Sequence, residues 1–514
     1  MDIKEIEKYT KIVIPNIEKQ LSSKEKTDQE KYELYNLYLD VLRLVGPWDF
    51  ASFNKYLEID EDHNVPTKAF FHHRKYHMDE MFTAFNDMEI YDKYDIMLIS
   101  LPPRTGKTTT GIRFLAWITG KYPEETQLAI SYSDNITQSF YVGVMEIVTS
   151  QRFKEIFPES ILVNQNAKRE EIWLKIAKRY PSITFAPIGG SLTGRCEASK
   201  YLYLDDLVSG LEEALSVVRL EKLWGLYTVN AKQRKKDGAK EIHVATRWSV
   251  HDPITRLSRE HANNPRCKVI NIPCYNENGE SNFDFTGGFS TQYYQELERT
   301  MDSFSFGALY KCEPIEREGL LYHEDEFQYY FELPTDKADT VVGICDSKNM
   351  GKDNVSAITG YVYGDFCYID DVVYNNGLPD VTRPLVANMW VKHNTVRADV
   401  EMNNGGNYYA EDLDQMIHSL GGKTSIRMFF SSNNKLTKII TYSDFVKKYF
   451  IFRHPSTYHP NSEYGRFMKD VLSWTQTGNN KTDDSVDSLA MLAQLVQELE
   501  GNAVKFLSRR KLGI

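Results

Sequence analysis

A short segment with the residue types of a phosphate-binding loop follows an apolar run. Residues 95–101 predict a strand, residues 102–108 read Pro-Pro-Arg-Thr-Gly-Lys-Thr, and a predicted helix follows. In this order, backbone N–H groups at the helix start face phosphates, Lys107 neutralises their charge, and Thr108 offers its hydroxyl to Mg²⁺. Pro102 stands where the usual motif has its first glycine, but proline also holds a tight turn. The residues expected to bind the nucleotide are Arg104, Thr105, Gly106, Lys107, Thr108 and Thr109.

An apolar strand that ends in two acids is predicted about a hundred residues further on, at residues 201–206. Such a strand suits the metal and water end of an ATPase. We expect Asp205 to hold Mg²⁺ and Asp206 to position the attacking water. The second acid is usually Glu, so a nearby side chain, Glu212 or Glu213, is an alternative base. The plainer interpretation is a strand-end turn with a capping Asp.

Two further polar positions fit the same chemistry. Residues 189–195, Gly-Gly-Ser-Leu-Thr-Gly-Arg, form a flexible loop that presents Arg195. An arginine supplied to a neighbouring subunit stabilises the charge of phosphoryl transfer, although a plain surface arginine is the alternative. Thr246 follows the predicted strand 241–245, a position from which a hydroxyl senses the γ-phosphate or serves only the structure.

Acidic residues in the last third of the chain stand at the ends of predicted elements. Two predicted strands carry Asp346 and Glu401, and a predicted final helix starts at Asp483 and Asp484. Acids from two strands and one helix form the skeleton of an RNase H-like nuclease, in which two Mg²⁺ or Mn²⁺ ions are clamped. Helix capping is the alternative for the last two acids. Other acids that rank lower are Asp353, Asp370 and Asp371.

The elements that must position these side chains predict an α/β protein. Short apolar runs alternate with helical stretches, which is typical of a mostly parallel sheet. The expected regions are a helical N-terminal region at 1–65, an ATPase domain at 66–317, a linker at 318–338, a nuclease domain at 339–500 and a basic tail at 501–514.

Composition fits a globular enzyme. The 514 residues are 41% hydrophobic and 26% charged, and the six cysteines form no CxxC pair. We expect free thiols in a reducing cytoplasm, and no signal peptide or membrane-spanning helix. The net charge of −11 counts against a static nucleic-acid coat but allows local grip on DNA. Basic side chains considered for that grip are Lys232, Arg234, Lys235, Lys236, Lys435 and Lys438.

In order and spacing, the motifs resemble those of tailed-bacteriophage terminase large subunits. The similar segments read PPRTGKT, GGSLTGR, the strand ending in Asp-Asp, ATRW, the strand ending in Asp346, VEMNNGG and DDSVDSLA, and they cover about residues 70–500. The resemblance implies an ASCE-type P-loop ATPase joined to an RNase H/RuvC-like nuclease. It places Arg195 at the trans-acting arginine, Thr246 in the ATPase-coupling motif, and Asp346, Glu401 and Asp484 at the nuclease acids.

Further implications of the resemblance concern activity and partners. Such a protein hydrolyses ATP to move double-stranded DNA through the portal protein into the prohead, and it cuts the concatemer. It works with a small terminase subunit and as a homo-oligomeric ring, usually a pentamer. It acts in the host cytoplasm and transiently on the prohead, without a membrane, and it is absent from the mature virion.

Two other readings share some of these features. A helicase or repair-type ATPase fused to a resolvase-like nuclease would have both sites but no need of a portal. A scaffold would keep a relic of the P-loop and use its acids only as helix caps.

Overall fold

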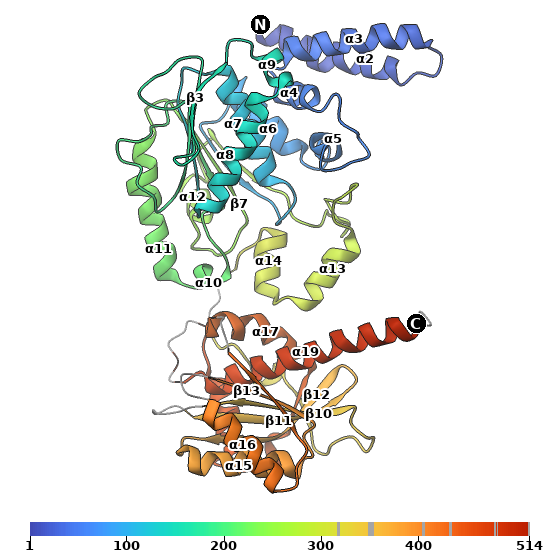
Figure 1. Cartoon of the computed structure of the whole chain (residues 1–514), viewed down its shortest axis with the longest axis vertical. Coiled ribbons are helices and arrows are strands. Elements are labelled where there is room, and N and C mark those ends of the chain that lie inside the picture. The colour runs from blue at the N-terminus through green and yellow to red at the C-terminus, as the bar shows by residue number, and fades with distance from the viewer. Residues whose placement is uncertain are drawn as a thin grey trace. The chain divides into compact units, whose positions relative to one another are not determined.

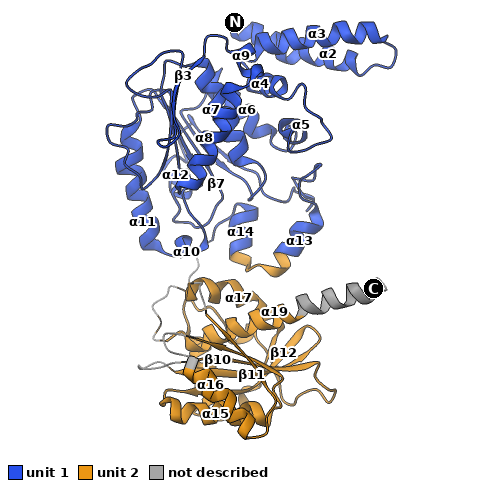
Figure 2. Ribbon diagram, in the orientation of Figure 1, with its two compact units in different colours: residues 1–297, 305–315 blue, residues 298–304, 316–514 orange. Residues whose placement is uncertain are grey.

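Two parallel-rich β-sheets, each covered by helices, organise the chain in this computed structural model (Figure 1). The structure describes residues 1–514 except 316–318, 348–353, 403–406, 431–433, 477–479, 481 and 512–514, and it leaves out the side chains of 407 and 500–511. The chain divides into two compact units, unit 1 with residues 1–297 and 305–315, and unit 2 with residues 298–304 and 316–514 (Figure 2).

Unit 1 is built on an eight-stranded sheet of order β3-β4-β5-β2-β6-β7-β1-β8. The strands are β1 (Ile96–Ser100), β2 (Gln127–Ser131), β3 (Leu162–Asn166), β4 (Glu171–Leu174), β5 (Ile183–Pro187), β6 (Tyr201–Asp205), β7 (Lys240–Ala245) and β8 (Cys267–Asn271). All neighbours pair in parallel except β3 with β4 and β4 with β5. Strand β7 lies between β1 and β6, so the carboxyl ends of these three strands meet at one edge of the sheet.

The helices of unit 1 cover this sheet and extend it at the N-terminus. They are α1 (Ile3–Lys8), α2 (Ile14–Leu21), α3 (Asp28–Val45), α4 (Phe50–Leu57), α5 (Phe70–Arg74), α6 (Asp79–Glu89), α7 (Lys107–Lys121), α8 (Asp134–Thr149), α9 (Gln151–Ile156), α10 (Leu211–Ala214), α11 (Val217–Gly225) and α12 (Pro253–Glu260). Helices α13 (Thr291–Thr300) and α14 (Ser303–Lys311) lie where the chain passes between the units. Two π-helical segments, Tyr9–Val13 and Leu226–Ala231, join neighbouring helices.

The N-terminal helices belong to the packing of unit 1. Helix α3 starts with a capping box, in which Thr27 and Glu30 bond each other's backbone N–H groups. The indole of Trp117 in α7 donates to the backbone oxygen of Gly46, 2.9 Å away, and Tyr56 donates to Glu155. The N-terminal region is therefore helical, as expected, over 3–21, 28–45 and 50–57, and it braces the helix that follows the phosphate-binding loop.

Helix α7 approaches strand β6 closely because Gly111 leaves room for a tyrosine. A Cβ at Gly111 would lie 2.1 Å from the hydroxyl oxygen of Tyr203. Such a separation is far below van der Waals contact. This glycine thus fixes the distance between the helix after the phosphate-binding loop and the strand that ends in Asp205.

Unit 2 holds a seven-stranded sheet of order β14-β13-β10-β11-β12-β15-β9. Its strands are β9 (Gln328–Tyr330), β10 (Thr340–Asp346), β11 (Val355–Tyr363), β12 (Phe366–Asn375), β13 (Arg397–Glu401), β14 (Ser425–Phe429) and β15 (Phe450–Arg453). Its helices are α15 (Pro379–Lys392), α16 (Asn407–Ser419), α17 (Lys435–Tyr449), α18 (Glu463–Ser473) and α19 (Asp484–Lys511). Strands β10, β11 and β12 form an antiparallel meander, and the other pairs are parallel.

Helices cover both faces of this second sheet. Figure 1 shows α15 and α16 on one face and α17 and α19 on the other. Gly343 of β10 faces Trp390 of α15, whereas Gly360 of β11 faces Leu492 of α19. Because side chains alternate along a strand, Asp346 lies on the α19 face.

The expected α/β class and the helical N-terminal region are confirmed, and the chain holds two parallel-rich sheets. Part of the expected linker at 318–338 belongs to the second sheet. Residues 328–330 form β9 at the edge of that sheet, where they pair with β15. Within the described part of the chain, no helix is long and apolar enough to cross a membrane.

Candidate nucleotide and metal sites

The loop between β1 and α7 has the shape of a phosphate-binding loop despite its proline. The Thr105 hydroxyl donates to the backbone oxygen of Pro102 at 2.8 Å, which closes the turn without the usual first glycine. Gly106 caps α7 with φ +116°, and a Cβ there would lie 2.8 Å from the ring of Phe70. Arg104 also has a positive φ and is exposed. The start of α7 therefore presents backbone N–H groups to a phosphate-sized ligand.

Lys107 lies buried at the ends of two strands. Its Nζ donates to the backbone oxygens of Leu101 and Pro102, at 2.9 and 3.0 Å. It also donates to Oγ1 of Thr246 at 2.8 Å. The structure thus brings together two residues expected at the nucleotide, although they are 139 residues apart in the chain. Thr109, expected in the same group, is exposed in the first turn of α7.

The two acids after β6 have different surroundings. Thr108 donates to Oδ2 of Asp205 at 3.2 Å, while Oδ1 is buried and has no hydrogen-bond partner among the residues the structure describes. Burial and the neighbouring Asp206 raise the pKa of Asp205, and the charge of Lys107 opposes this shift. A hydroxyl beside an unsatisfied buried carboxylate fits Mg²⁺, since a hard cation favours oxygen ligands.

Asp206 connects the acid-bearing strand to the Thr246 strand. It has φ +37°, and its Oδ1 accepts the backbone N–H of Thr246 at 2.6 Å. The alternative bases are engaged at the surface, since Glu213 accepts the N–H and hydroxyl of Ser209 and Glu212 pairs with Arg219 at 2.9 Å. Asp206 is therefore the second acid that lies among the residues of this site.

Arg195 makes its contacts within its own unit. Its Nε donates to Oε1 of Glu171 at 3.0 Å, and its guanidinium also donates to the backbone oxygens of Phe185 and Arg169. Glu171 is buried, whereas about a quarter of the Arg195 side chain is exposed, at 23%. A role toward a neighbouring subunit would require this arginine to exchange those contacts.

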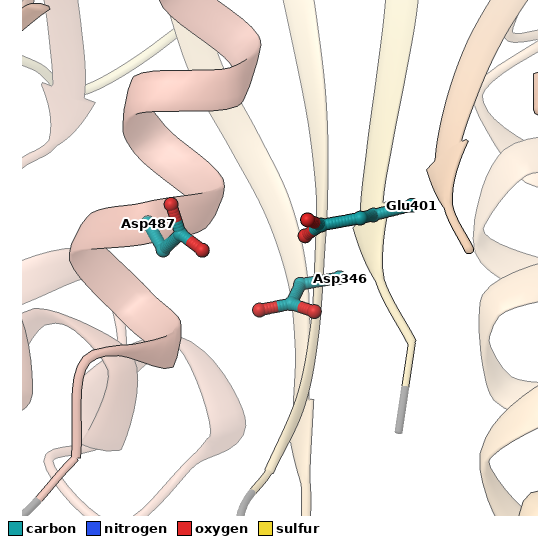
Figure 3. Close-up of side chains that lie close together, drawn as sticks. All are labelled: Asp346, Glu401 and Asp487. Carbon is teal, nitrogen blue, oxygen red and sulfur yellow. The ribbon is translucent and has the colours of Figure 1, made fainter. Parts of the chain in front are cut away.

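A second site lies on the α19 face of the unit 2 sheet. Asp346 and Glu401 are direct neighbours in the register of the parallel strands β10 and β13. Asp487, in the first turn of α19, points toward both (Figure 3). Carboxylate oxygens of the three residues lie within 4.8 Å of one another, and all three side chains are buried. This is the geometry of a carboxylate metal centre.

Two lysines of α17 reach into the same acidic cluster. Lys438 Nζ lies 2.7 Å from Asp487, and Lys435 Nζ lies 3.4 to 3.7 Å from Asp483, Asp487 and Asp346. The acids hold the pKa of Lys435 well above its usual range, despite burial. These lysines were considered for DNA contact. The structure places both beside the acids, with Lys438 buried and 38% of the Lys435 side chain exposed.

Charge in this cluster favours a divalent cation. Burial raises the pKa of Asp346, and the charge of Lys435 opposes the shift while neighbouring acids add to it. Burial also raises the pKa of Glu401. One oxygen of Glu401, Oε2, is buried and accepts no hydrogen bond from the part of the chain that the structure describes. A cation would satisfy that oxygen and offset the repulsion, so the residues fit Mg²⁺ or Mn²⁺.

The helix-start acids expected as metal ligands lie beside this cluster and not among its three converging carboxylates. Asp484 is buried, and its Oδ2 accepts the backbone N–H of Asn354 at 2.8 Å and the hydroxyl of Thr482 at 3.2 Å. Asp483 is partly exposed and pairs with Lys435. Asp487 was not selected from the sequence. Asp487 follows Asp484 by three residues, so both lie on one side of α19. This spacing is the sequence feature that could have identified Asp487.

The remaining candidates lie elsewhere. Asp371 accepts from Lys392 and contacts His393, and Asp370 accepts from Tyr330, away from the three acids. In the basic run of unit 1, Lys235 pairs with Glu241 and Lys236 with Glu197. Asp353 and the side chains of the basic tail lie outside the described residues.

Comparison with solved structures finds large terminases of bacteriophages. The large terminase of a thermophilic bacteriophage, solved with ATP-γ-S, is 11% identical with a TM-score of 0.42, and the match covers 80% of this chain and 97% of that chain. The HK97 large terminase is 10% identical, with a TM-score of 0.34 and coverage of 80% and 94%. The nuclease domain of the Sf6 large terminase subunit is 10% identical, with a TM-score of 0.24 and coverage of 31% and 89%.

No family model and no curated protein sequence matches the chain. Identities near 10% and TM-scores below 0.5 assign no activity. The side chains of the two sites are what indicate a function.

Proposed function

We propose that the chain is the large subunit of a tailed-phage terminase, an ATPase that moves double-stranded DNA into a prohead and a nuclease that cuts it. The observation that carries the proposal is the presence of two chemically different sites in one chain. Unit 1 has a phosphate-binding loop beside Asp205, and unit 2 has three buried acids, two at the ends of neighbouring strands and one in α19.

In unit 1, the nucleotide phosphates would meet the start of α7 and the amine of Lys107. Lys107 would exchange its bonds to backbone oxygens for phosphate oxygens. Thr108 and Asp205 would hold Mg²⁺, and Asp206 would orient the attacking water. The bond between Asp206 and the N–H of Thr246 links the water-positioning acid to the strand end that contacts Lys107. Loss of the γ-phosphate would therefore change the contacts of Thr246 at the end of β7.

In unit 2, Asp346, Glu401 and Asp487 would hold divalent ions, with Asp484 and Asp483 at the rim of the cluster. When bound, such ions activate a water and stabilise the leaving oxygen of a DNA phosphate. Lys435 and Lys438 offset part of the negative charge of the acids. They would move from the acids toward the DNA backbone when metal ions offset that charge instead.

The partners follow from the same proposal. A packaging ATPase would bind double-stranded DNA, the portal protein and a small terminase subunit, and would act as a homo-oligomeric ring on the prohead. Arg195 would then reach the nucleotide of the next subunit after leaving Glu171.

Separate loss of the two activities tests the assignment. Purified protein is assayed for ATP hydrolysis and for plasmid cleavage with Mn²⁺. Lys107→Ala is expected to abolish hydrolysis and leave cleavage, and Asp346→Ala is expected to do the reverse. Asp399→Asn is a matched control, because Asp399 is a buried acid two residues before Glu401 that pairs with Arg397 and Arg427. Plasmid cleavage that persists in Asp346→Ala would contradict the nuclease assignment.

A packaging assay separates this proposal from a helicase or repair enzyme. Portal-bearing proheads, ATP and double-stranded DNA are supplied, and DNA protected from added nuclease is measured. Protection that needs both Lys107 and the portal is expected. ATP-driven strand separation without any protected DNA would favour the helicase reading.

A further inference from the structure

The carboxylate of Asp470 gathers three hydroxyl groups at the start of α19. Asp470 lies in α18, and its Oδ2 accepts the hydroxyl of Tyr374 in β12 at 2.5 Å. The same oxygen accepts the hydroxyls of Thr482 and Ser485, each at 3.3 Å. Burial and the neighbouring Asp470 raise the pKa of Tyr374, so its hydroxyl keeps the proton that it donates.

Thr482 links this carboxylate to the acidic site. Its Oγ1 accepts the backbone N–H of Asp484 at 3.3 Å, in the manner of a helix cap. The same hydroxyl lies 3.2 Å from Oδ2 of Asp484 and 3.3 Å from Asp470. A hydroxyl has one proton, so it can donate to only one of the two carboxylates at a time. Asp470 and Asp484 are therefore coupled through a single side chain.

The other side of the same helical turn is held by serines. Ser488 contacts Ser356 of β11 at 2.7 Å and donates to the backbone oxygen of Ser485 at 2.9 Å. Ser485 and Ser488 are fully buried. The first turn of α19 is thus fixed between β11 on one side and Asp470 on the other, and this turn carries both Asp484 and Asp487.

We infer that Asp470 is a positioning residue for the nuclease site: by anchoring Thr482 and Ser485 it sets the first turn of α19, so that Asp487 meets Asp346 and Glu401. The inference rests on the proposed nuclease function. A metal site needs its ligands within about 0.5 Å of their working positions, and such precision comes from the groups behind the ligands. Asp470 does not touch the metal-binding oxygens themselves.

Mn²⁺ affinity tests the inference independently of turnover. In Asp470→Ala, three hydroxyls lose their shared acceptor, and the dissociation constant for Mn²⁺ measured by calorimetry is expected to rise by about tenfold, as for outer-shell partners of metal ligands. The Mn²⁺ concentration for half-maximal plasmid cleavage is expected to rise in parallel. Asp470→Asn keeps an acceptor oxygen, so its dissociation constant for Mn²⁺ should lie between those of the parent and Asp470→Ala. This variant provides the test if Asp470→Ala does not fold.

Glu463→Ala is the matched control. Glu463 is in the same helix, seven residues or about two turns before Asp470. Its Oε1 accepts a hydrogen bond from Nδ2 of Asn375 in β12 at 2.6 Å. This variant is expected to lose stability while its Mn²⁺ affinity stays within about twofold of the parent, because its loss loosens α18 without releasing α19. An equal loss of affinity in both variants, or none in Asp470→Ala, would overturn the inference.

Thr482→Val tests the route of the coupling. If Asp470 acts through Thr482, the double variant Asp470→Ala/Thr482→Val should bind Mn²⁺ only slightly more weakly than either single variant, whereas independent effects would multiply. Failure of the nuclease proposal is recognised separately, because the parent would then show no Mn²⁺-dependent cleavage that Asp346→Ala removes. Cleavage that behaves as proposed, with multiplied effects at Asp470 and Thr482, contradicts only the coupling.

Discussion

Asp487 shows what a single helical turn decides. Asp484 stands at the start of α19, where a sequence pattern suggests a ligand, but its carboxylate accepts the N–H of Asn354. Asp487, three residues on, meets the acids of β10 and β13. The sequence pattern predicts that the third acid lies at the start of the last helix. It does not predict which acid of that turn is the ligand, because this depends on the rotation of α19 against the sheet.

We predict that Asp487→Asn lowers Mn²⁺-dependent plasmid cleavage at least about hundredfold, because residues that act as one catalytic unit fail together. Asp484→Asn is expected to lose less, since Asp484 lies outside the three oxygens that converge. Initial cleavage rates at saturating Mn²⁺ provide the measurement. A larger loss in Asp484→Asn than in Asp487→Asn would show that the helix-start acid is the principal ligand.

At the scale of elements, local sequence patterns predicted where strands begin and end better than they predicted which strands pair. Strands β1, β6 and β7 were expected within a residue or so of their observed ends, because each is a short apolar run followed by polar groups. Their adjacency depends on pairing between distant segments. The three-residue strand β9 was missed because so short a polar and aromatic segment has no readable period.

The close approach of α7 to β6 gives a prediction about both ends of the nucleotide site. Gly111→Ala would place a methyl group against the Tyr203 hydroxyl and is expected to lower the free energy of unfolding by about 1–3 kcal/mol, with weaker ATP binding. Tyr203→Phe alone is expected to be neutral or slightly stabilising. Its hydroxyl is buried without a hydrogen-bond partner in the described part of the chain.

The double variant Gly111→Ala/Tyr203→Phe should recover only part of the lost stability. It removes the hydroxyl, but a Cβ at position 111 would still lie 2.7 Å from the ring carbon Cζ at position 203. Urea unfolding and nucleotide titration measure both properties. A double variant as unstable as Gly111→Ala alone would mean that the hydroxyl contributes nothing to the clash.

Strand β7 is tied to the segment after α11 by a buried acid. Burial alone would raise the pKa of Glu241, but hydrogen bonds from His243 and Tyr227 and the charge of Lys235 hold it at about 2. A depressed carboxyl pKa contributes stability that is complete above the ordinary value near 4.5. That contribution is lost as the pH falls toward 2.

We therefore predict that Glu241→Gln destabilises unit 1 at pH 7 by up to about 3 kcal/mol. The difference from the parent should shrink steadily below pH 4.5, where the parent begins to lose the same contribution. Urea unfolding at several pH values measures it. Glu221→Gln, which removes a surface partner of Arg256, serves as the control and should change little at any pH. A difference that does not depend on pH would exclude the charge of Glu241 as its cause.

At the scale of the molecule, two units and two kinds of chemistry were expected, and two compact units are observed. The boundary between the units could not be predicted from the sequence. Residues 298–304 belong to unit 2 and residues 305–315 to unit 1, so the boundary cuts through α13 and α14. Residues 295–306 contain no proline or glycine, so no local composition marks such a crossing.

Since each site is built within one unit, each ligand should stabilise its own unit. We predict two unfolding transitions by calorimetry. At a constant Mg²⁺ concentration, ATP-γ-S should raise the midpoint temperature of one transition. Mn²⁺ without nucleotide should raise that of the other. A ligand at a hundred times its dissociation constant adds about 2.7 kcal/mol to the unit that binds it. Lys107→Ala should remove the first shift only, and Asp346→Ala the second only. Equal movement of both transitions with either ligand would contradict independent sites.

The bonds of Lys107 have a consequence for the timing of a cycle. Its amine has three oxygen partners that follow the ends of β1 and β7. Under the proposed function, phosphate binding would exchange these partners for phosphate oxygens, and its net gain would be much smaller than the sum of the new bonds. The reverse exchange would leave no unpaired buried charge when product departs. Such a lysine would suit an enzyme that must release its product at every step.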